Sequence, residues 1–487
     1  MSTSDTVPAG RTADDLDRQH PRRGASKWHL AAPLVLAVLG PAEARADDVD
    51  DLAPGTWFEI PNTPMRDVCP PDTADYDWSF FCQSAIGAWS GGALDTTRGR
   101  LIVWGGGHGD YKGNEVYVFD MQTLAWERVW GPSADAQIPE GGTHEQYDDG
   151  TPGSRHTYSG LTYVPPPHDA LVSMGGSLWQ TGFYGAGTWS FSFDVGEWTR
   201  LTDGPAESGF GDPSVYDPET GTIFRRGNQR MLQFDPIADV YTERAASDGG
   251  FWASNVSAAL DPEARTMVIL GDGRLDLYHL DTDTYEQDVT LAGAGVSELL
   301  GDASPGVGYD SQQGRIVAWG GGLNVYTLDL EALSFAEFEG AGDDPGAITP
   351  SGGAFGRFRY VPSRNVFVSV NDVDENVFVF RMSEGMGVPP DPPGGSGSSD
   401  GAADDDGAVD DSTGAEPPGG SDADPPSDPP EGGTTSSGTP GGETGGTAGA
   451  GEGDDDGCSC RTSPESERGW WLLALGIALV GRRRRGT

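Results

Sequence analysis

Short runs in which apolar and polar residues alternate recur between residues 53 and 384, and each is bounded by glycine or a polar turn. Alternation with a period of two is typical of half-buried β-strands. Five of these runs end in an Asp that an aromatic residue follows: VYVFDMQTLAW, SFSFDVGEW, MLQFDPIADVY, LYHLDTDTY and VYTLDLEALSF. A β-rich run and a turn precede each of them. The pattern therefore predicts an all-β domain in which a four-stranded unit repeats.

The last repeat is incomplete, and its missing strand lies at the other end of the chain. The sixth copy, YVPSRNVFVSVNDVDENVFVF, ends at Phe380 without a closing strand, and GTWFEIP at residues 55–61 is an isolated strand of the right kind. We expect this N-terminal strand to complete the sixth unit and close a ring of sheets, which leaves little strand edge exposed. A β-sandwich of regular hairpins is the alternative fold.

Two stretches resemble kelch repeats: GGGHGDYKGNEVYVFD followed by Trp126, and RIVAWGGGLNVYTLD followed by Phe335. The resemblance covers most of residues 53–384, and the repeat length of about 50 residues is similar to the kelch period. It implies a six-bladed β-propeller of the galactose oxidase-like central domain superfamily. The third, fourth and sixth repeats depart from the kelch pattern because they lack the full glycine run. The copper oxidation of galactose oxidase is excluded, because no predicted propeller strand carries the cysteine which that chemistry needs.

The composition shows in which segment much of the negative charge lies and which class of partner it excludes. The 74 glycines argue against a helical enzyme, and much of the net charge of −46 lies in residues 385–457. This segment is rich in Asp, Pro, Gly, Ser and Thr and cannot bury enough apolar surface to fold, so we expect a disordered acidic linker. The remaining chain is also acidic. Nucleic acid is therefore excluded as a partner, since binding it takes a basic face.

Both ends of the chain carry predicted targeting segments. In residues 1–46 a basic stretch precedes the apolar LAAPLVLAVLG and a small-x-small pattern ending at Ala46, as in a secretory signal with a long leader. Residues 458–487 hold GCSC, the apolar WWLLALGIALVG and RRRR, and they resemble the bacterial sorting tails called MYXO-CTERM. That resemblance implies processing near Cys458 or Cys460, membrane contact through the tail, and display on the cell surface or outer membrane, or release from it.

The two remaining cysteines are Cys69 and Cys82. In an exported chain such a close pair is expected to form a disulfide. Zinc is not expected, because imidazole and thiolate ligands do not cluster around them, and acidic loops such as YDDG lack a regular calcium spacing. We expect no cofactor and a monomeric protein.

Four connections are much longer than their equivalents in other repeats. They are residues 62–90, 105–115, 131–155 and 175–187. In a propeller, the connection between the second and third strands emerges on the same face as the crossing to the next blade. All four are therefore predicted to rise from one face, around the first two blades. Long loops on a rigid scaffold are where binding residues concentrate.

Polar candidates lie in these connections. His108, Asp110 and Tyr111 follow a glycine run that lets the backbone turn sharply and come near a ligand. The alternative role of His108 is to cap that turn by bonding a neighbouring carbonyl. His156 stands beside Arg155, and two imidazoles with a guanidinium would suit an anionic sugar or a carboxylate.

Further candidates lie in the same loops. His144 lies in the acidic 131–155 loop. Trp179, Phe183 and Tyr184 would present flat apolar faces to sugar rings or else pack between blades.

Two function classes remain open. The first is a recognition module for a glycan or protein ligand, which binds through the loop-rich face. The second is an enzyme on acidic polysaccharide, such as a lyase, in which Arg155 or His108 would neutralise the uronate and His156 or Tyr184 would remove a proton. The sequence alone does not decide whether the protein is an enzyme.

Overall fold

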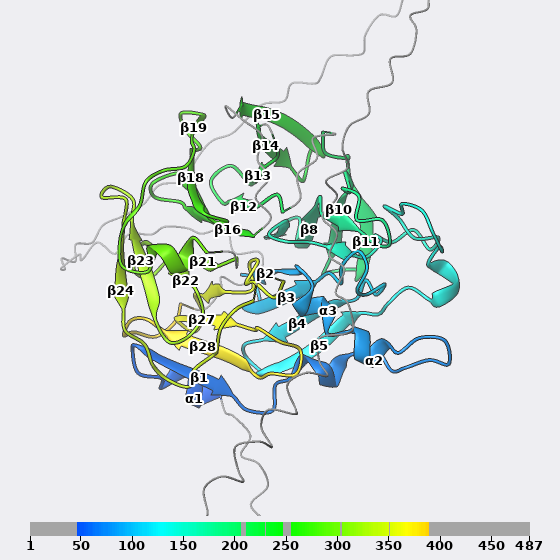
Figure 1. The fold of residues 1–487 in the computed structure, drawn as a ribbon, viewed down its shortest axis with the longest axis horizontal. Coiled ribbons are helices and arrows are strands. Elements are labelled where there is room, and N and C mark those ends of the chain that lie inside the picture. The colour runs from blue at the N-terminus through cyan, green and yellow to red at the C-terminus, as the bar shows by residue number, and fades with distance from the viewer. Residues whose placement is uncertain are drawn as a thin grey trace, which may run out of the picture. The chain divides into compact units, whose positions relative to one another are not determined.

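The computed structural model describes residues 46–205, 211–228, 230–246, 255–301, 304–349 and 351–388. These residues form an all-β propeller of six sheets, as predicted (Figure 1). Residues 1–45 and 389–487, with nearly all of the predicted signal, acidic linker and sorting tail, lie outside the described residues. Across the described ranges, none of the helices has the length and apolar character needed to cross a membrane.

Each blade is an antiparallel sheet whose strands follow one another from the ring centre outward. Blade one has β2 (Gly91–Asp95), β3 (Arg100–Trp104), β4 (Val116–Asp120) and β5 (Ala125–Trp130). Blade two has β7 (Leu161–Val164), β8 (Ala170–Met174), β10 (Thr188–Ser192) and β11 (Glu197–Arg200). Blade three has β12 (Ser214–Asp217), β13 (Thr222–Arg226), β14 (Arg230–Asp235) and β15 (Val240–Ala246).

The other three blades follow the same plan. Blade four has β16 (Val256–Asp261), β17 (Thr266–Gly271), β18 (Arg274–His279) and β19 (Thr284–Glu286). Blade five has β21 (Gly306–Asp310), β22 (Arg315–Trp319), β23 (Val325–Asp329) and β24 (Ser334–Phe338). Blade six has β26 (Arg359–Val361), β27 (Val366–Ser369), β28 (Val377–Arg381) and β1 (Thr56–Ile60).

Short elements occupy the connections. The two-residue strands are β6 (Arg155–His156), β9 (Ser177–Leu178), β20 (Ala292–Gly293) and β25 (Ala341–Gly342). The helical turns are α1 (Ala46–Asp50), η1 (Met65–Val68), α2 (Trp78–Phe81), α3 (Ser84–Gly87), η2 (Asp135–Gln137) and α4 (Val296–Leu299). β20 and β25 each add in parallel to the outermost strand of a blade, β24 and β1 respectively, which covers two sheet edges.

The N-terminal strand closes the ring, as the incomplete sixth repeat predicts. β1 pairs with β28 in antiparallel register, with Trp57 opposite Phe380. The Trp57 side chain is buried, and its indole Nε1 donates a hydrogen bond to the Leu323 carbonyl of blade five, 2.9 Å away. The first strand of every blade contacts the first strand of the next, including β26 with β2. The apolar cores lie between neighbouring sheets, so each blade is stabilised by both neighbours.

The recurring Asp of the sequence pattern has a structural role. In Asp120, Asp235 and Asp329, one carboxylate oxygen accepts hydrogen bonds from the backbone N–H groups two and three residues further on. The residue four positions after each Asp has a left-handed backbone, with φ of 53°, 55° and 47°. This geometry turns the chain into the outermost strand, where the aromatic residue packs against the sheet.

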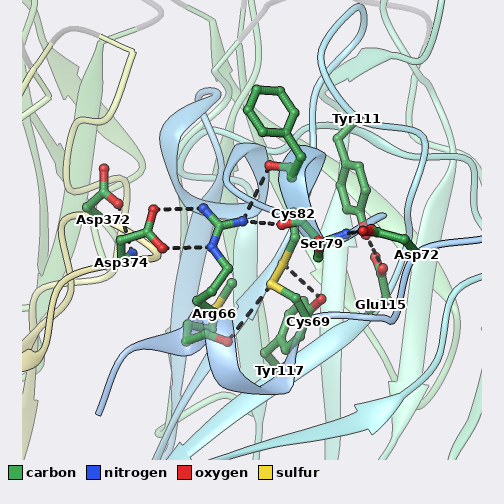
Figure 2. Close-up of a disulfide and its surroundings, with 12 residues drawn as sticks. Arg66, Cys69, Asp72, Ser79, Cys82, Tyr111, Glu115, Tyr117, Asp372 and Asp374 are labelled. Carbon is green, nitrogen blue, oxygen red and sulfur yellow. Dashed lines mark hydrogen bonds and ion pairs between the residues drawn. A yellow bond between two sulfur atoms is a disulfide. The ribbon is translucent and has the colours of Figure 1, made fainter. Parts of the chain in front are cut away.

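The crossing from blade six to blade one is held by a disulfide. Cys69 and Cys82 are bonded, as predicted, and Figure 2 shows the pair between η1 and α2. Arg66 of η1 makes two hydrogen bonds, of 2.7 and 2.8 Å, with the carboxylate of Asp374 in blade six. The crossing is therefore fixed at both of the blades that it connects.

Candidate functional site

The four long connections lie side by side, as predicted. The backbone N–H of Gly106 donates to the Arg155 carbonyl at 3.1 Å, and that of Trp179 donates to the Ser154 carbonyl at 2.9 Å. The crossing from blade six joins them, because the N–H of Tyr158 donates to the Trp89 carbonyl at 2.8 Å. These hydrogen bonds join loops from three blades into one surface.

His108 and His156 meet on this surface. Their ring centroids lie 4.6 Å apart. The Nε2 atom of His156 lies 3.0 Å from Oδ2 of Asp110. His108 and Asp110, which follow Gly107 in the bend, therefore both lie next to the His156 imidazole. Gly107 has a φ of +100°, and a Cβ there would lie 2.5 Å from Nε2 of His156. The glycine is required both for the turn and for the close approach of the ring.

Burial affects the protonation states of His156 and Asp110 in this cluster. The His156 side chain is only 2% exposed, and burial lowers its pKa even though the Asp110 carboxylate opposes that shift. Burial of Asp110 acts to raise its pKa, but the hydrogen bond from His156 and the nearby imidazoles lower it overall. At neutral pH a neutral His156 thus donates its Nε2–H to an ionised Asp110. The Nδ1 atom of His156 is then an acceptor, and it is buried with no hydrogen-bond partner among the described residues.

Aromatic residues that the sequence reasoning missed surround His156. The ring of Trp89 lies 4.9 Å from the imidazole centroid and that of Tyr158 lies 5.7 Å from it. Trp89, Tyr158 and Phe355 precede the first strands of blades one, two and six, and each has a left-handed backbone, with φ of 45°, 45° and 39°. Such conformations are costly for bulky residues and cluster at functional sites. The signal in the sequence is an aromatic residue followed within two positions by glycine (WSG, YSG and FG).

Arg155 lies within the protein and not on the binding surface. Its side chain is fully buried, and its guanidinium forms an ion pair with Glu145 at 2.8 Å. The remaining donors go to the carbonyls of Gly153, Gly175 and Glu145 at 3.1 Å each. The expectation that Arg155 grips an anionic ligand is therefore not met in this geometry. Arg155 holds two of the long connections together instead.

Three further candidates are also held within the protein. Tyr111 is buried in the core under the disulfide loop, and its hydroxyl donates to Glu115. The ring of Tyr184 contacts the Arg225 guanidinium, which binds its hydroxyl. Trp179 is half-buried against the core between blades six and one.

The exposed groups are Asp110, Gln180 and Phe183. Phe183 is 64% exposed, and the neighbouring Gly182 approaches His108 so closely that a Cβ there would lie 3.4 Å from its Nδ1. The N–H of Gln180 donates to the His108 carbonyl. His144 lies further along the 131–155 loop, with its Nε2 against the Gly141 carbonyl. The loop-rich surface therefore presents the exposed rings of Phe183 and of Phe80, which is 58% exposed in the 62–90 connection, together with the His108 imidazole and the Asp110 carboxylate.

The fold and this surface define a six-bladed β-propeller with an elaborated loop face. No protein-family model matches the chain, and no curated protein matches it in sequence. Within the described ranges, no three His, Cys, Asp or Glu side chains are placed to share a metal ion.

Proposed function

We propose that the protein is a recognition module that binds a glycan through the loop-rich face of blades one and two. The observation that carries this proposal is the exposed Phe183 ring, whose chain neighbour Gly182 closely approaches His108, on loops that are hydrogen-bonded to one another and that also carry Asp110. A flat apolar ring can cover one face of a sugar. An ionised carboxylate accepts hydrogen bonds from the sugar hydroxyls, and an imidazole N–H donates hydrogen bonds to them. A partner protein is the other ligand class that the sequence predicts.

The charge of the surface favours a neutral sugar. Arg155 is occupied by Glu145, His156 is held neutral by burial, and Asp110 is ionised. A carboxylate without a matching cation repels an acidic sugar and accepts hydrogen bonds from neutral hydroxyls. The proposal therefore replaces the anionic ligand expected from the sequence with an uncharged glycan.

The same proposal includes display at the cell surface. The signal-like residues 1–46, the acidic linker 385–457 and the tail 458–487 support export and anchoring, and the resemblance to kelch repeats supports a binding role for the propeller. A linker of like charges extends by self-repulsion and would hold a monomeric propeller away from the membrane.

Replacing Phe183 with alanine is expected to weaken glycan binding about tenfold, because the stacked ring is lost. The measurement is a glycan array followed by calorimetric titration of the best ligand. Ile237→Ala is the matched control, since Ile237 is 62% exposed and lies in the turn between β14 and β15, far from the loops in sequence. Equal affinities for the Phe183 variant and the wild type would contradict the proposal, as would an array with no ligand at about millimolar concentration.

A second candidate function has one specific observation in its favour. His156 is held by Asp110 through Nε2, and its buried Nδ1 has no hydrogen-bond partner among the described residues, which is the arrangement of a general base oriented by a carboxylate. In a lyase on uronate polymers this base would remove the C5 proton, and His108 would neutralise the uronate. Arg155 and Tyr184 have no part in this chemistry, because Arg155 forms an ion pair with Glu145 and the Tyr184 hydroxyl is bound by Arg225.

If the protein is such a lyase, His156→Ala should lower the rate by about 10²–10⁴-fold. The rate is followed as ultraviolet absorbance of the unsaturated product from uronate polymers. His279→Gln in β18 of blade four is the control and should leave the rate unchanged. Wild-type protein that yields no unsaturated product would remove the lyase from consideration, and a signal that persists in the His156 variant would remove His156 from the mechanism.

A further inference from the structure

A cavity of about 320 Å³ lies on the axis of the ring, at the end opposite the loop-rich face. Residues of the first strands of all six blades line it, and so do residues of the short turns that follow these strands, such as Thr96, Pro165, Pro218 and Pro262. Its volume is at the lower end of the range for ligand pockets, about 300–1,000 Å³. The cavity is separate from the surface around His108.

The repeat shows which side chain is unusual in this cavity. The position two residues before the end of each first strand faces the cavity in every blade. Five blades place a small or neutral residue there and the sixth places an arginine: Ala93, Thr162, Val215, Ala259, Gly308 and Arg359. Among the lining residues, all of which belong to the described part of the chain, Arg359 is the single charged one.

Arg359 has donor capacity that the protein does not use. Its Nε donates to the Gly356 carbonyl at 2.9 Å, and its Nη1 donates to the Ala258 carbonyl of blade four at 3.3 Å. No carboxylate pairs with it in the described residues, and its Nη2 has no acceptor there. By contrast, Arg357 on the same segment is fully buried and its guanidinium donates to four backbone carbonyls.

The electrostatic state of Arg359 follows from its position. Arg359 is half-buried, and burial lowers its pKa to about 10, so the guanidinium remains charged at neutral pH. The aspartates that end the other first strands, Asp95, Asp217, Asp261 and Asp310, do not neutralise it, since none of them forms an ion pair with Arg359 or lines the cavity. Asp95 is paired with Arg98 and Arg100, Asp217 is paired with Arg265, and neither aspartate lines the cavity. A half-buried charge without an oppositely charged partner is less well stabilised than a paired one, which favours binding of an anion that supplies the partner.

The next position along each first strand determines the shape of the ligand. It carries a tyrosine in four blades, Tyr163, Tyr216, Tyr309 and Tyr360, and a leucine in the other two. These residues surround the outer end of the cavity with apolar surface. One cation among apolar walls matches a single negative charge on an apolar body, since a dianion would bring one charge more than Arg359 can neutralise.

We propose that the axial cavity is a binding site for a small organic monocarboxylate. The carboxylate pairs with the Arg359 guanidinium, and the apolar part of the molecule lies among the tyrosine rings. This site is independent of the glycan surface, because the two lie at opposite ends of the ring. The proposal can therefore hold or fail without any bearing on the proposed function.

The test is calorimetric titration of the propeller-containing chain with benzoate, and with benzamide as the neutral molecule of the same shape. Benzoate is expected to bind saturably and about tenfold or more tighter than benzamide, because only the carboxylate pairs with the guanidinium. Arg359→Gln is expected to lose about the same factor. Arg315→Gln is the matched control, since Arg315 begins β22 next to the same turns but does not line the cavity.

Three results would overturn the proposal: equal affinity for benzoate and benzamide, unchanged benzoate binding in folded Arg359→Gln protein, and tighter binding of inorganic phosphate than of benzoate. If the Arg359→Gln protein fails to fold, Arg359→Lys keeps the charge but loses the forked donors, and it should bind benzoate more weakly than the wild type. Phe183→Ala should leave benzoate binding unchanged, which distinguishes this site from the loop-rich face.

Discussion

Replacing Trp57 with alanine is expected to lower the free energy of unfolding by about 4 kcal/mol, the range for a fully buried tryptophan. Trp57 belongs to β1, the strand that the N-terminus contributes to blade six. Its ring centroid lies 5.3 Å from that of Trp319, 6.4 Å from that of Phe358 and 4.9 Å from that of Phe380. The substitution removes contacts on both sides of the junction between blades five and six, so the ring is weakened at its closure.

The measurement is urea unfolding followed by tryptophan fluorescence and circular dichroism. Trp57→Phe should fall between the wild type and the alanine variant, because it keeps the apolar ring but loses the hydrogen bond to the Leu323 carbonyl. Glu59→Ala, at an exposed position of the same strand, should change stability by less than about 0.5 kcal/mol. A Trp57→Ala protein that unfolds at the wild-type urea concentration would show that β1 does not close the ring.

The stability of the protein is expected to depend on the ionisation of Glu115. This side chain lies at the start of the strand that follows the glycine-rich bend, beside Tyr111 and close to the disulfide (Figure 2). Burial raises the pKa of Glu115 to about 7, against the opposing effects of the Tyr111 hydroxyl and the Arg128 charge. Its Oε2 atom is buried without a hydrogen-bond partner among the described residues.

The direction of the pH dependence follows from that raised pKa. Between pH 4.5, the ordinary pKa of a glutamate, and about pH 7, the folded protein keeps the Glu115 proton that the unfolded chain releases. The stabilisation is complete below this window and is lost as the pH rises through it. The difference between the two pKa values corresponds to about 3 kcal/mol of unfolding free energy in total. Glu115→Gln protein carries a neutral side chain at every pH and should not show this loss.

Unfolding free energies of the wild type and of the Glu115→Gln protein, measured from pH 4 to pH 8, test this prediction. Because other carboxyl and imidazole groups titrate in the same range, the difference between the two proteins is the informative quantity. It should move by about 3 kcal/mol in favour of the glutamine variant as the pH rises. Glu127→Gln, an exposed position on β5, should track the wild type. A constant difference across the range would show that the pKa of Glu115 is not raised on folding.

The architecture could be predicted because its signals are local. The alternation of each strand, the Asp that caps the turn before each outermost strand, and the missing last strand of the sixth repeat all lie within short windows of sequence. Propeller topology then assigns each connection to a face, so the gathering of the four long connections also followed from the order of the strands. The disulfide between Cys69 and Cys82 was predicted from the short spacing of the two cysteines and the expectation of export.

The roles of single side chains could be predicted less well, because they depend on partners far away in the chain. The approach of His108 to His156 and the burial of Arg155 against Glu145 arise from contacts between loops of different blades. The sequence reasoning gave Arg155, Tyr111 and Tyr184 a place in the site, and the structure shows each of them held by protein groups. Phe183 stands exposed among three aromatic residues that sequence alone does not rank.

By itself, the sequence determined the number of blades, their order and the side from which the long loops rise, because strand periodicity and turn chemistry act over a few residues. Only the tertiary structure determined which guanidinium groups of the described residues lack a carboxylate partner. Arg155 and Arg359 both stand in or next to first strands, yet Arg155 meets a carboxylate and Arg359 faces a cavity without one. The difference depends on what segments from other blades bring to each guanidinium when the ring closes, and no local pattern records it.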